Sequence, residues 1–481
     1  MNSAPTSTAP TSTNALYRAV WRWHFYAGIV VAPFAIFLAI TGAIYLWKPQ
    51  FEEWRYRDLF NVPGSTTTVS ATVQFAAAQA AVPDGWRAQT FQPSFAPGRT
   101  TQVAFKSAGR AARPFGPVLN VFVNPHTGTV VGQLDDGTRF MRIVHDLHGT
   151  LLAGKTGEYL VELAASWALV LFLTGLYLWW PRPRFVVWGF LLPRLRAEGR
   201  VFWRDIHAVP AVWCAAASLF LLSTGMLWSQ ASGQWYRTIS AAIGQGTPRD
   251  SSTSAHRSEL VGWSPPLKAG LAQKIDALAS RPAADDPHAE HRAAARDDSE
   301  SSNSKSKTPA ISLDRVVALA AEHQVPTPYA IALPVGPTGV YSVLSDRNQA
   351  FSRTYLHLDQ YSGGVLADIR FKDFGYLAQF SLWGIIAHEG QLFGLLNQIL
   401  GTLAALSVFL LAVSGLIMWW QRRPAGQLAA PVSTASLPRP VVIGTFALAM
   451  LLPLLAASLA LLLIFDRLLS HRLPWFKLTS T

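Results

Sequence analysis

The sequence is short of two kinds of residue that soluble proteins use freely. It has a single cysteine, Cys214, and only 14% of its 481 residues are charged, against about 25% in an average soluble protein. One cysteine excludes an internal disulfide, a zinc cluster, an iron–sulfur cluster and c-type haem attachment. No glycine-rich nucleotide-binding motif is present either. Because the shortage of charge is confined to long apolar stretches, it is typical of a membrane protein with aqueous domains between its spans.

Five stretches are apolar over about 20 residues, the length that crosses a bilayer. They predict an integral membrane α-helical bundle of about five spans with two large inserts. The predicted order is a disordered N-terminus (1–15), a first span (16–48), an insert domain (49–140), a pre-helix and second span (141–181), a basic loop (182–204), a third span (205–230), a second insert domain (231–385) with a disordered insertion (247–309), a pre-helix and fourth span (386–421), a second loop (422–440), a fifth span (441–466) and a tail (467–481).

The positive charges predict the orientation of this chain. Its net charge of +12 reflects arginines beside the spans, and no basic helix with base-reading chemistry is present, so we expect no nucleic-acid partner. Arginine and lysine favour the cytoplasmic side of a bacterial inner membrane. We therefore expect the N-terminus and both loops inside and the two insert domains in the periplasm. The arginines of the first loop are Arg182, Arg184, Arg194, Arg196, Arg200 and Arg204.

The first and third spans carry a duplicated pattern. Thr41-Gly42 aligns with Thr224-Gly225, and the threonine of each pair follows a histidine, His24 or His207, by 17 residues. Each histidine then falls at the inner end of its span. This pattern predicts that the chain consists of two repeated halves.

The second and fourth spans repeat in the same way. Leu-Thr-Gly-Leu-Tyr-Leu-Trp-Trp at 173–180 aligns with Val-Ser-Gly-Leu-Ile-Met-Trp-Trp at 413–420, which places His148 and His388 at equivalent outer positions, 27 residues before the glycine. His145 has no such counterpart, since Ile385 takes its place. His148 lies 11 residues before Tyr159, about 16 Å on a straight helix. We expect a break at 154–157 that lets the histidine segment pack back toward the bilayer.

The two inserts also resemble each other. Residues 70–83 and 312–326 have helical patterns, and residues 120–131 and 355–366 alternate like strands around a glycine-containing turn, which favours a β-hairpin. Each insert is therefore predicted to be a small, separate α+β domain.

Paired histidines at membrane depth favour ligation, because ionisable groups there are costly and usually functional. Two imidazoles are too few to hold zinc by themselves. A b-type haem needs only axial ligands and an apolar pocket, so two haems are expected. The candidate ligands are His24, His207, His148 and His388, with His145 as an alternative to His148. The other interpretation is that these histidines anchor helix ends at the membrane interface.

Several local motifs resemble the PepSY-associated transmembrane family. They are Trp-Arg-Trp-His-Phe-Tyr-Ala-Gly at 21–28, Pro-His-Thr-Gly at 125–128, His-Asp-Leu-His-Gly at 145–149, Thr-Gly-Leu-Tyr-Leu-Trp-Trp-Pro at 174–181 and His-Glu-Gly at 388–390. The resemblance runs from about 16 to 424 and implies that both inserts are PepSY-like domains.

The resemblance also implies an activity, since members of this type look like inner-membrane haem-containing ferric-siderophore reductases. Electrons from a separate cytoplasmic reductase or from membrane quinol would reduce a periplasmic ferric siderophore, or another ferric chelate, and release Fe(II). His24, His207, His148 and His388 would then be the haem ligands, with His145 a third candidate at the outer site.

Two other classes of function remain open at this stage. A non-enzymatic PepSY membrane protein would bind or regulate a periplasmic protease or sense an envelope signal. A transporter is disfavoured, because the spans lack paired acidic residues. Six arginines of the first insert, Arg87, Arg99, Arg110, Arg113, Arg139 and Arg142, are candidates to attract an anionic ligand, although a solvated basic surface explains each of them as well.

Overall fold

The computed structural model describes residues 12–107, 118–180, 187–258, 310–345, 350–423 and 439–469. The chain divides into two compact units. The membrane unit takes its residues from 1–46, 144–235 and 388–481, and the sheet unit consists of 47–143 and 236–387. Most of the predicted disordered insertion, from 259 to 309, and most of both termini lie outside the described residues.

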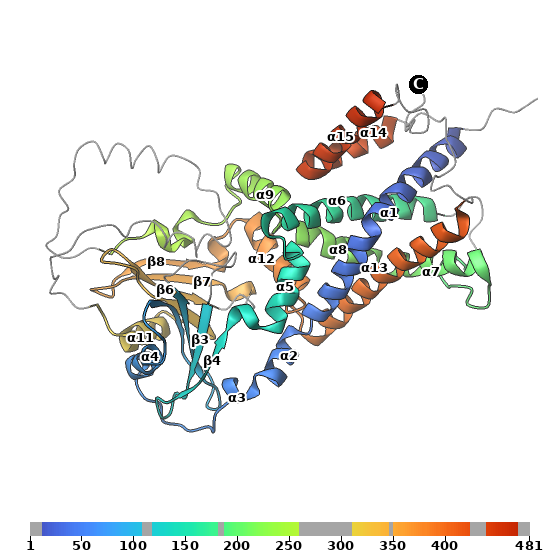
Figure 1. Ribbon diagram of the computed structural model, residues 1–481. Coiled ribbons are helices and arrows are strands. Elements are labelled where there is room, and N and C mark those ends of the chain that lie inside the picture. The colour runs from blue at the N-terminus through green and yellow to red at the C-terminus, as the bar shows by residue number, and fades with distance from the viewer. Residues whose placement is uncertain are drawn as a thin grey trace, which may run out of the picture. The chain divides into compact units, whose positions relative to one another are not determined.

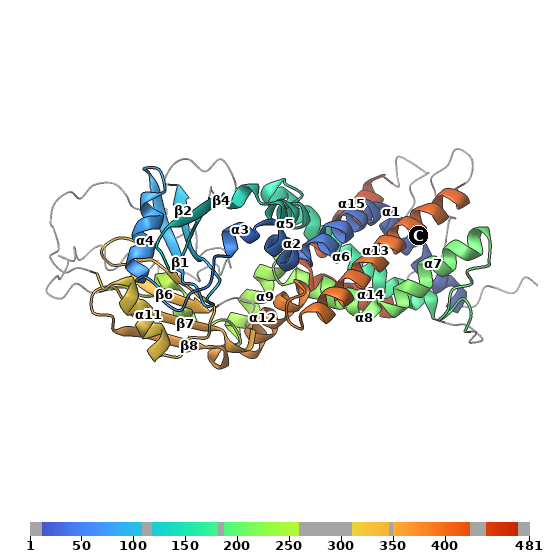
Figure 2. The ribbon, with the colours of Figure 1, turned by 90° about the horizontal axis from the view of Figure 1, so that it is seen from below.

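Three helices of the membrane unit are long and apolar enough to cross a membrane. They are α1 (Ser12–Tyr45), α6 (Gly154–Trp179) and α13 (Leu395–Arg422), and α1 packs against both of the others (Figures 1 and 2). These candidate spans indicate a multi-pass membrane protein. The remaining helices that lie wholly or partly in this unit are α5 (Phe140–Thr150), α7 (Gly199–Trp213), α8 (Ala215–Met226), α9 (Ala231–Ala242), α14 (Arg439–Leu451) and α15 (Pro453–Leu469).

The prediction of five spans in two repeated halves is wrong. The third predicted span is two helices, α7 and α8, that meet at Cys214 with a bend of 66°, so the described residues contain three candidate spans, or four if this pair counts as one. The fifth is divided at Leu452, where α14 ends and Pro453 starts α15. Proline explains the second interruption, because Pro453 lacks an N–H and clashes with the preceding turn. The halves also differ, since α1 is continuous where α7 and α8 are bent.

The sheet unit contains one antiparallel sheet of eight strands in the order β4-β3-β2-β1-β5-β6-β7-β8. The prediction of two separate insert domains is therefore wrong, because β1 pairs with β5 through Phe91 and Ile331 and joins the two inserts into one sheet. This pairing gives hydrogen-bond partners to backbone N–H and C=O groups that would otherwise be unpaired at the edges of β1 and β5. The strands are β1 (Trp86–Gln92), β2 (Thr101–Ser107), β3 (Val118–Val123), β4 (Val130–Asp135), β5 (Tyr329–Ala332), β6 (Val340–Ser345), β7 (Thr354–Asp359) and β8 (Val365–Arg370).

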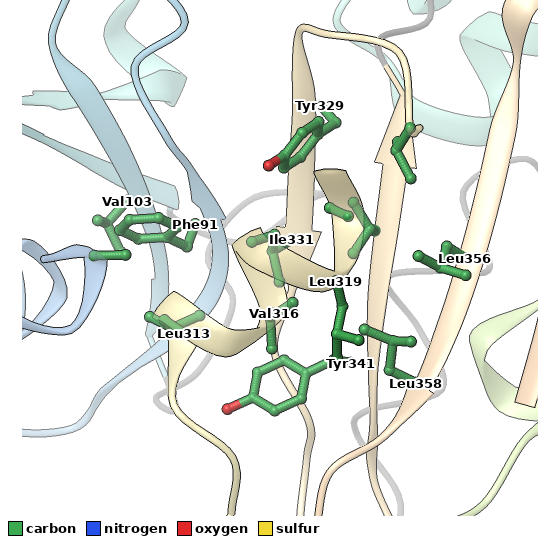
Figure 3. Packing of buried hydrophobic residues seen from close by; sticks show 14 of the residues in the cluster. Phe91, Val103, Leu313, Val316, Leu319, Tyr329, Ile331, Tyr341, Leu356 and Leu358 are labelled. Carbon is green, nitrogen blue, oxygen red and sulfur yellow. The ribbon is translucent and has the colours of Figure 1, made fainter. Parts of the chain in front are cut away.

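Two helices cover one face of this sheet and enclose its core. They are α4 (Ala71–Ala80) and α11 (Leu313–Glu322), which pack against each other as well (Figures 1 and 2). Figure 3 shows how the apolar side of α11 contributes Leu313, Val316 and Leu319 to the cluster. The strands supply Phe91, Val103, Ile331, Leu356 and Leu358, none of which is exposed. Burial of apolar surface from both inserts therefore stabilises one common core.

The remaining elements of the sheet unit are short. They are α2 (Lys48–Arg55), α3 (Arg57–Phe60), α12 (Tyr376–His388) and the 3-10 turns η1 (Asp136–Thr138), η2 (Arg249–Ser251), η3 (Thr253–Ala255), η6 (Ala350–Ser352) and η7 (Phe371–Asp373). The turns η2 and η3 fall at the start of the segment that the sequence predicts to be disordered.

A carboxylate of α11 caps the N-terminus of α4. Ser70 caps α4 by accepting a hydrogen bond from the Val73 N–H, and Ser312 caps α11 by accepting one from the Arg315 N–H. Asp314 of α11 also accepts hydrogen bonds from the Ala71 N–H at 2.6 Å and the Thr72 hydroxyl at 2.6 Å, both in the first turn of α4. Partial burial by itself would raise the pKa of Asp314, but these hydrogen bonds outweigh it and lower the pKa below its ordinary value. Asp314 thus ties the two inserts together at a helix N-terminus.

We expect Asp314→Ala to lower the free energy of unfolding of the sheet unit by about 1–2 kcal/mol, the usual cost of removing a helix cap. Thermal unfolding of the full chain in detergent measures this. Asp84→Ala is the matched control, because Asp84 is an exposed carboxylate with no hydrogen bond or ion pair within the described residues. Equal losses in both variants would contradict the cap.

Candidate functional site

Four histidines of the membrane unit meet as two pairs. His24 of α1 and His207 of α7 have ring centres 6.3 Å apart, with the rings at 89°. His148 of α5 and His388 at the end of α12 have ring centres 6.5 Å apart, at 62°. The structure thus brings together the four equivalent histidines of the duplicated sequence, in the pairs that the alignment matches.

Each of these histidines is held through Nδ1 by a hydroxyl on a neighbouring helix. The pairs are His148 with Thr41 at 3.0 Å, His24 with Thr174 at 2.9 Å, His388 with Thr224 at 3.2 Å and His207 with Ser414 at 3.1 Å. In the sequence these hydroxyl residues stand out because they align with each other in the repeated motifs. Their contact with the histidines is visible only in the structure. The repeated Thr/Ser-Gly pair is the signal that marks them.

The hydroxyl network selects one tautomer of each imidazole. The Thr41 hydroxyl donates its one hydrogen to the Phe37 carbonyl oxygen in its own helix, at 2.9 Å, so its oxygen is left to accept from His148. Thr174, Thr224 and Ser414 donate in the same way to the carbonyl four residues earlier. The Leu411 carbonyl, which only accepts, also receives Nδ1–H of His207 at 2.9 Å. This arrangement favours the tautomer with hydrogen on Nδ1 in all four histidines, which keeps the lone pair of Nε2 for a ligand.

A glycine follows each hydroxyl residue and makes room for the ring. A Cβ atom at Gly42 would lie 3.1 Å from Cε1 of His148, and one at Gly225 would lie 3.1 Å from Cε1 of His388. Gly175 and Gly415 leave the same kind of space for His24 and His207, with Cβ distances of 3.3 and 3.5 Å. The Thr/Ser-Gly pair thus acts as a clamp, in which the hydroxyl orients the ring and the glycine lets it approach. We call each such unit a histidine clamp.

The chain breaks beside the second pair, close to where the sequence predicts. Helix α5 ends at Thr150 and α6 begins at Gly154, and Leu151 and Leu152 between them adopt positive φ values of 51° and 57°. A Cβ atom at Gly157 would lie 1.6 Å from the Thr150 carbonyl oxygen, so only glycine fits this fold-back. The reversal lets His148 contact α1 instead of extending away from it.

The two pairs lie far apart along α1. His24 belongs to this helix, and Thr41, which holds His148, follows 17 residues later. At 1.5 Å per residue these positions are separated by about 25 Å, close to the thickness of a bilayer's hydrocarbon core. The membrane unit therefore has one histidine pair toward each end of its first span.

A cavity of about 450 Å³ lies between the helices at the first pair. Its wall is mostly apolar and includes His24, His207 and Trp419, together with Arg204 and Arg422. The indole Nε1 of Trp419 is buried and has no hydrogen-bond partner among the described residues. By contrast, Trp179 in the same wall donates to the Phe190 carbonyl oxygen at 3.1 Å. The cavity therefore combines an apolar interior with an unused donor and the cation Arg422, whereas Arg204 is already paired with Asp205. This combination suits a large, flat ligand that carries an acidic group.

His145 is not part of either pair. Its Nδ1 lies 3.1 Å from the carboxylate of Asp146, and its ring centre is 5.5 Å from that of Tyr45. Among the described residues, no three or more His, Cys, Asp and Glu side chains form a group that could hold a metal ion. The pairs thus offer two imidazoles each, and any metal held there needs further ligands from a cofactor.

The apolar spans also contain a buried carboxylate that the sequence analysis missed. Glu162 of α6 is only 1% exposed and accepts hydrogen bonds from the Ala231 N–H, the Ser232 N–H and the Ser232 hydroxyl, all within 2.8 Å. These groups form the first turn of α9, so Glu162 serves as a helix cap inside the membrane unit. A glutamate within an apolar span is the signal in the sequence that marks it.

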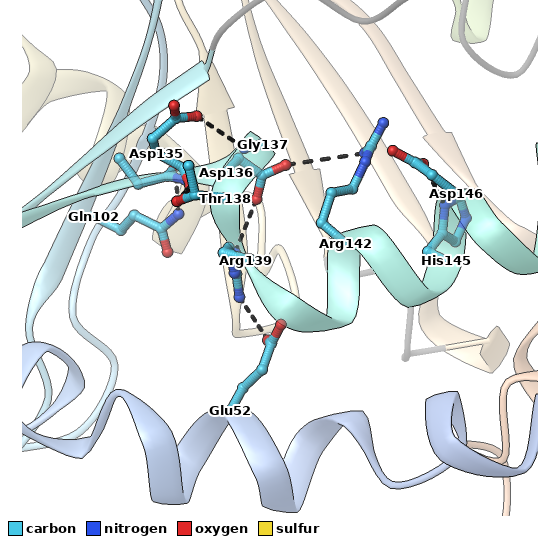
Figure 4. A network of polar contacts seen from close by, with 11 residues as sticks. Glu52, Gln102, Asp135, Asp136, Gly137, Thr138, Arg139, Arg142, His145 and Asp146 are labelled. Atoms are coloured by element: carbon cyan, nitrogen blue, oxygen red, sulfur yellow. Dashed lines mark hydrogen bonds and ion pairs between the residues drawn. The ribbon is translucent and has the colours of Figure 1, made fainter. Parts of the chain in front are cut away.

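Three of the six arginines proposed to attract an anion in the first insert, Arg99, Arg139 and Arg142, are ion-paired. Figure 4 shows Arg139 between Glu52, at 2.6 Å, and Asp136, at 3.0 Å, with Arg142 beside the same aspartate. Arg99 pairs with Glu53 at 2.8 Å, and Arg110 and Arg113 lie outside the described residues. The three ion-paired arginines therefore stabilise the unit locally.

One histidine pair of the sheet unit is structural. His357 of β7 is fully buried, its Nδ1 lies 2.8 Å from the Ser342 hydroxyl, and its ring centre is 4.5 Å from that of His256. Burial, and then the nearby His256, lower the pKa of His357 to about 4. His256 therefore packs against a residue of the sheet.

This burial predicts a pH dependence of stability. Below about pH 6.5 the unfolded chain binds a proton at His357 that the folded chain does not bind. The free energy of unfolding therefore falls as the pH drops from 6.5 to 4, by at most about 3 kcal/mol. Thermal midpoints of the full chain in detergent from pH 7.5 to 4.5 measure the slope, which His357→Gln should flatten. Parallel slopes for the two proteins would contradict the assignment.

Fold and site together define a multi-pass membrane protein with paired histidines in its helical bundle and an antiparallel sheet unit. The chain belongs to the PepSY-associated TM region family, whose model matches residues 21–422. No curated protein matches the chain. The match covers both histidine pairs, all four histidine clamps and the complete sheet.

Proposed function

We propose that this protein is a transmembrane haem electron-transfer protein that reduces a ferric siderophore or a similar ferric chelate in the periplasm. His24 and His207 would hold one b-type haem, and His148 and His388 would hold a second. A bound haem would supply one-electron chemistry, because its iron alternates between Fe(III) and Fe(II). The proposal rests above all on the spacing of the paired rings.

The spacing matches what two imidazoles on one iron require. A metal–imidazole bond is about 2 Å long and the ring centre lies about 1 Å behind the nitrogen, so two facing ligands have ring centres about 6 Å apart. The observed distances are 6.3 and 6.5 Å. The Nδ1–H tautomer adds support, because a metal-bound histidine usually donates its other N–H to a fixed acceptor.

The surroundings of the first pair fit the same ligand. The cavity walls that touch His24 and His207 are mostly apolar, which keeps water away from a bound macrocycle. Arg422 and the unpartnered Nε1 of Trp419 are donors suited to the carboxylates that haem carries, whereas Arg204 is held by Asp205. These residues would bind and orient the group and would not take part in the electron transfer themselves.

The substrate is proposed from the family resemblance, since the histidine pairs support only the proposal of a haem and say nothing of what it reduces. Reduction of Fe(III) weakens its binding to hard oxygen ligands and so releases the metal. The chain has no nucleotide-binding motif, so the electron donor would be a separate cytoplasmic reductase or membrane quinol. The sheet unit would lie in the periplasm, where it would receive the chelate.

We expect the purified full chain to show a b-type reduced-minus-oxidised spectrum with about two haems per chain by pyridine haemochrome, as two bis-imidazole sites require. His207→Ala and His388→Ala should each lose one haem, and the double variant should lose both. His145→Ala is the matched control for the second site and should keep two haems, because His145 faces Tyr45 and Asp146. A haem-free protein after expression with adequate haem would refute the proposal.

A smaller substitution provides a test of the second pair that does not depend on the histidine-to-alanine variants folding correctly. Gly42→Ala places a methyl group 3.1 Å from Cε1 of His148 and should weaken haem binding at that pair, whereas Gly149→Ala meets no atom within 4 Å and should not. Loss of haem in both variants would point to a general folding defect.

Reduced protein should be reoxidised by a ferric chelate under anaerobic conditions, with Fe(II) appearing in a chromogenic trap. His388→Ala, still holding the haem at His24 and His207, should be reoxidised at least about tenfold more slowly, since the pair at His148 would be the exit. Reoxidation at one rate with and without chelate would refute the reductase activity while leaving the haem sites intact.

A further inference from the structure

A second cavity, of about 280 Å³, lies in the sheet unit where β7 begins and β8 ends. These strands are at one side of the sheet, and Thr354 of β7 pairs with Arg370 of β8 (Figure 1). Three of the cavity's side chains are cationic and two are phenylalanines. Its lining comprises Pro326, Phe351, Ser352, Arg353, Thr354, Arg370, Phe371 and Lys372.

Arg353 is a buried cation that no carboxylate of the described residues neutralises. It is only 8% exposed, and its guanidinium donates to the Tyr355 hydroxyl at 2.9 Å and the Ser345 carbonyl at 3.1 Å, both neutral acceptors. It also lies 4.9 Å from the centre of the Tyr355 ring. Three of its five N–H groups are used in these hydrogen bonds. Because a buried charge is costly unless it is paired, the two remaining N–H groups favour an anion in the cavity.

The other two cations differ in what already binds them. Arg370 is neutralised by Asp368, which accepts from both its Nε and a terminal nitrogen, and it also donates to the His323 carbonyl at 2.6 Å. Lys372 is exposed and has no ion pair within the described residues. Asp373, the nearest acidic residue in sequence, accepts from the Arg370 N–H. The cavity therefore keeps two uncompensated positive charges, on Arg353 and Lys372.

An exposed aromatic surface adjoins these charges. Phe351 is 64% exposed, and its ring packs edge-on against Phe371, with centres 6.1 Å apart, and Trp383, at 6.3 Å. A large exposed phenylalanine beside a buried arginine suits a ligand with an apolar or aromatic body and an acidic group. The volume is close to the lower end of ordinary ligand sites, so the ligand would be small.

We propose that this cavity binds a small organic anion, with a carboxylate held by Arg353 and Lys372 and an apolar or aromatic body held against Phe351 and Phe371. We call it the Arg353 site. A carboxylate would complete the hydrogen bonding of the Arg353 guanidinium and balance its charge. The inference is independent of the proposed haem function, because every residue of the site belongs to the sheet unit.

The test is a ligand-observed NMR titration of the full chain in detergent with benzoate, which has one carboxylate on one aromatic ring. Benzamide, of nearly the same shape but neutral, should bind about tenfold or more weakly, and sulfate should do the same because it lacks the apolar body. Affinity for benzoate should also fall as salt is raised.

Two variants locate the binding. Arg353→Gln should weaken benzoate binding about tenfold or more, in line with the loss of charged hydrogen bonds. Because Arg353 also contacts Tyr355, Lys372→Gln gives a second test at an exposed residue, with a smaller but measurable loss. Arg315→Gln, which removes an exposed arginine paired with Glu322 on α11, is the control and should bind benzoate like the wild type.

Three results would overturn the Arg353 site. They are equal affinity for benzoate and benzamide, equal affinity for benzoate and sulfate, or benzoate affinity that neither Arg353→Gln nor Lys372→Gln reduces. A haem-free preparation that still binds benzoate would separate this proposal from the proposed function, since it would support the first while refuting the second.

Discussion

Each membrane histidine of this protein is held by a hydroxyl that has already given its hydrogen to its own helix. This single constraint decides the tautomer, because a Thr41 or Thr224 oxygen bonded to a backbone carbonyl as donor can only accept from the imidazole. The imidazole stays neutral in an apolar bundle, where a charged ring would be costly. Its Nε2 then remains free for a ligand, and the following glycine leaves the ring enough space to sit close to the neighbouring helix.

The rest of the membrane unit serves to bring these clamps together. The break at Leu151 and Leu152 turns His148 back onto α1, and the bend at Cys214 separates α7, which carries His207, from α8, which carries Thr224. Four clamps from one repeated dipeptide thus produce two ring pairs with nearly equal spacing. The interruptions in the helices are part of how the pairs form.

In the sheet unit the two inserts are joined to each other. Two similar inserts combine into one eight-stranded sheet through β1 and β5, and α4 and α11 share a single core. Asp314 links the two helices across the inserts. Three arginines that look like part of an open basic surface in the sequence are paired with Glu52, Glu53 and Asp136. By contrast Arg353, which no sequence motif marks, is a buried cation with no carboxylate partner among the described residues.

The sequence by itself determined the apolar spans at α1, α6 and α13, the helix-plus-hairpin content of each insert and the four histidines that form the pairs. These features follow from composition and from repeats at fixed spacing, which are local properties of the chain. Only the tertiary structure decided that His148 and not His145 faces His388, that the third predicted span is bent and that the two inserts form one sheet. Such outcomes depend on which distant groups satisfy each other's hydrogen bonds and fill each other's space. Thr41 with His148 and Phe91 with Ile331 are contacts of this kind, between residues more than 100 positions apart.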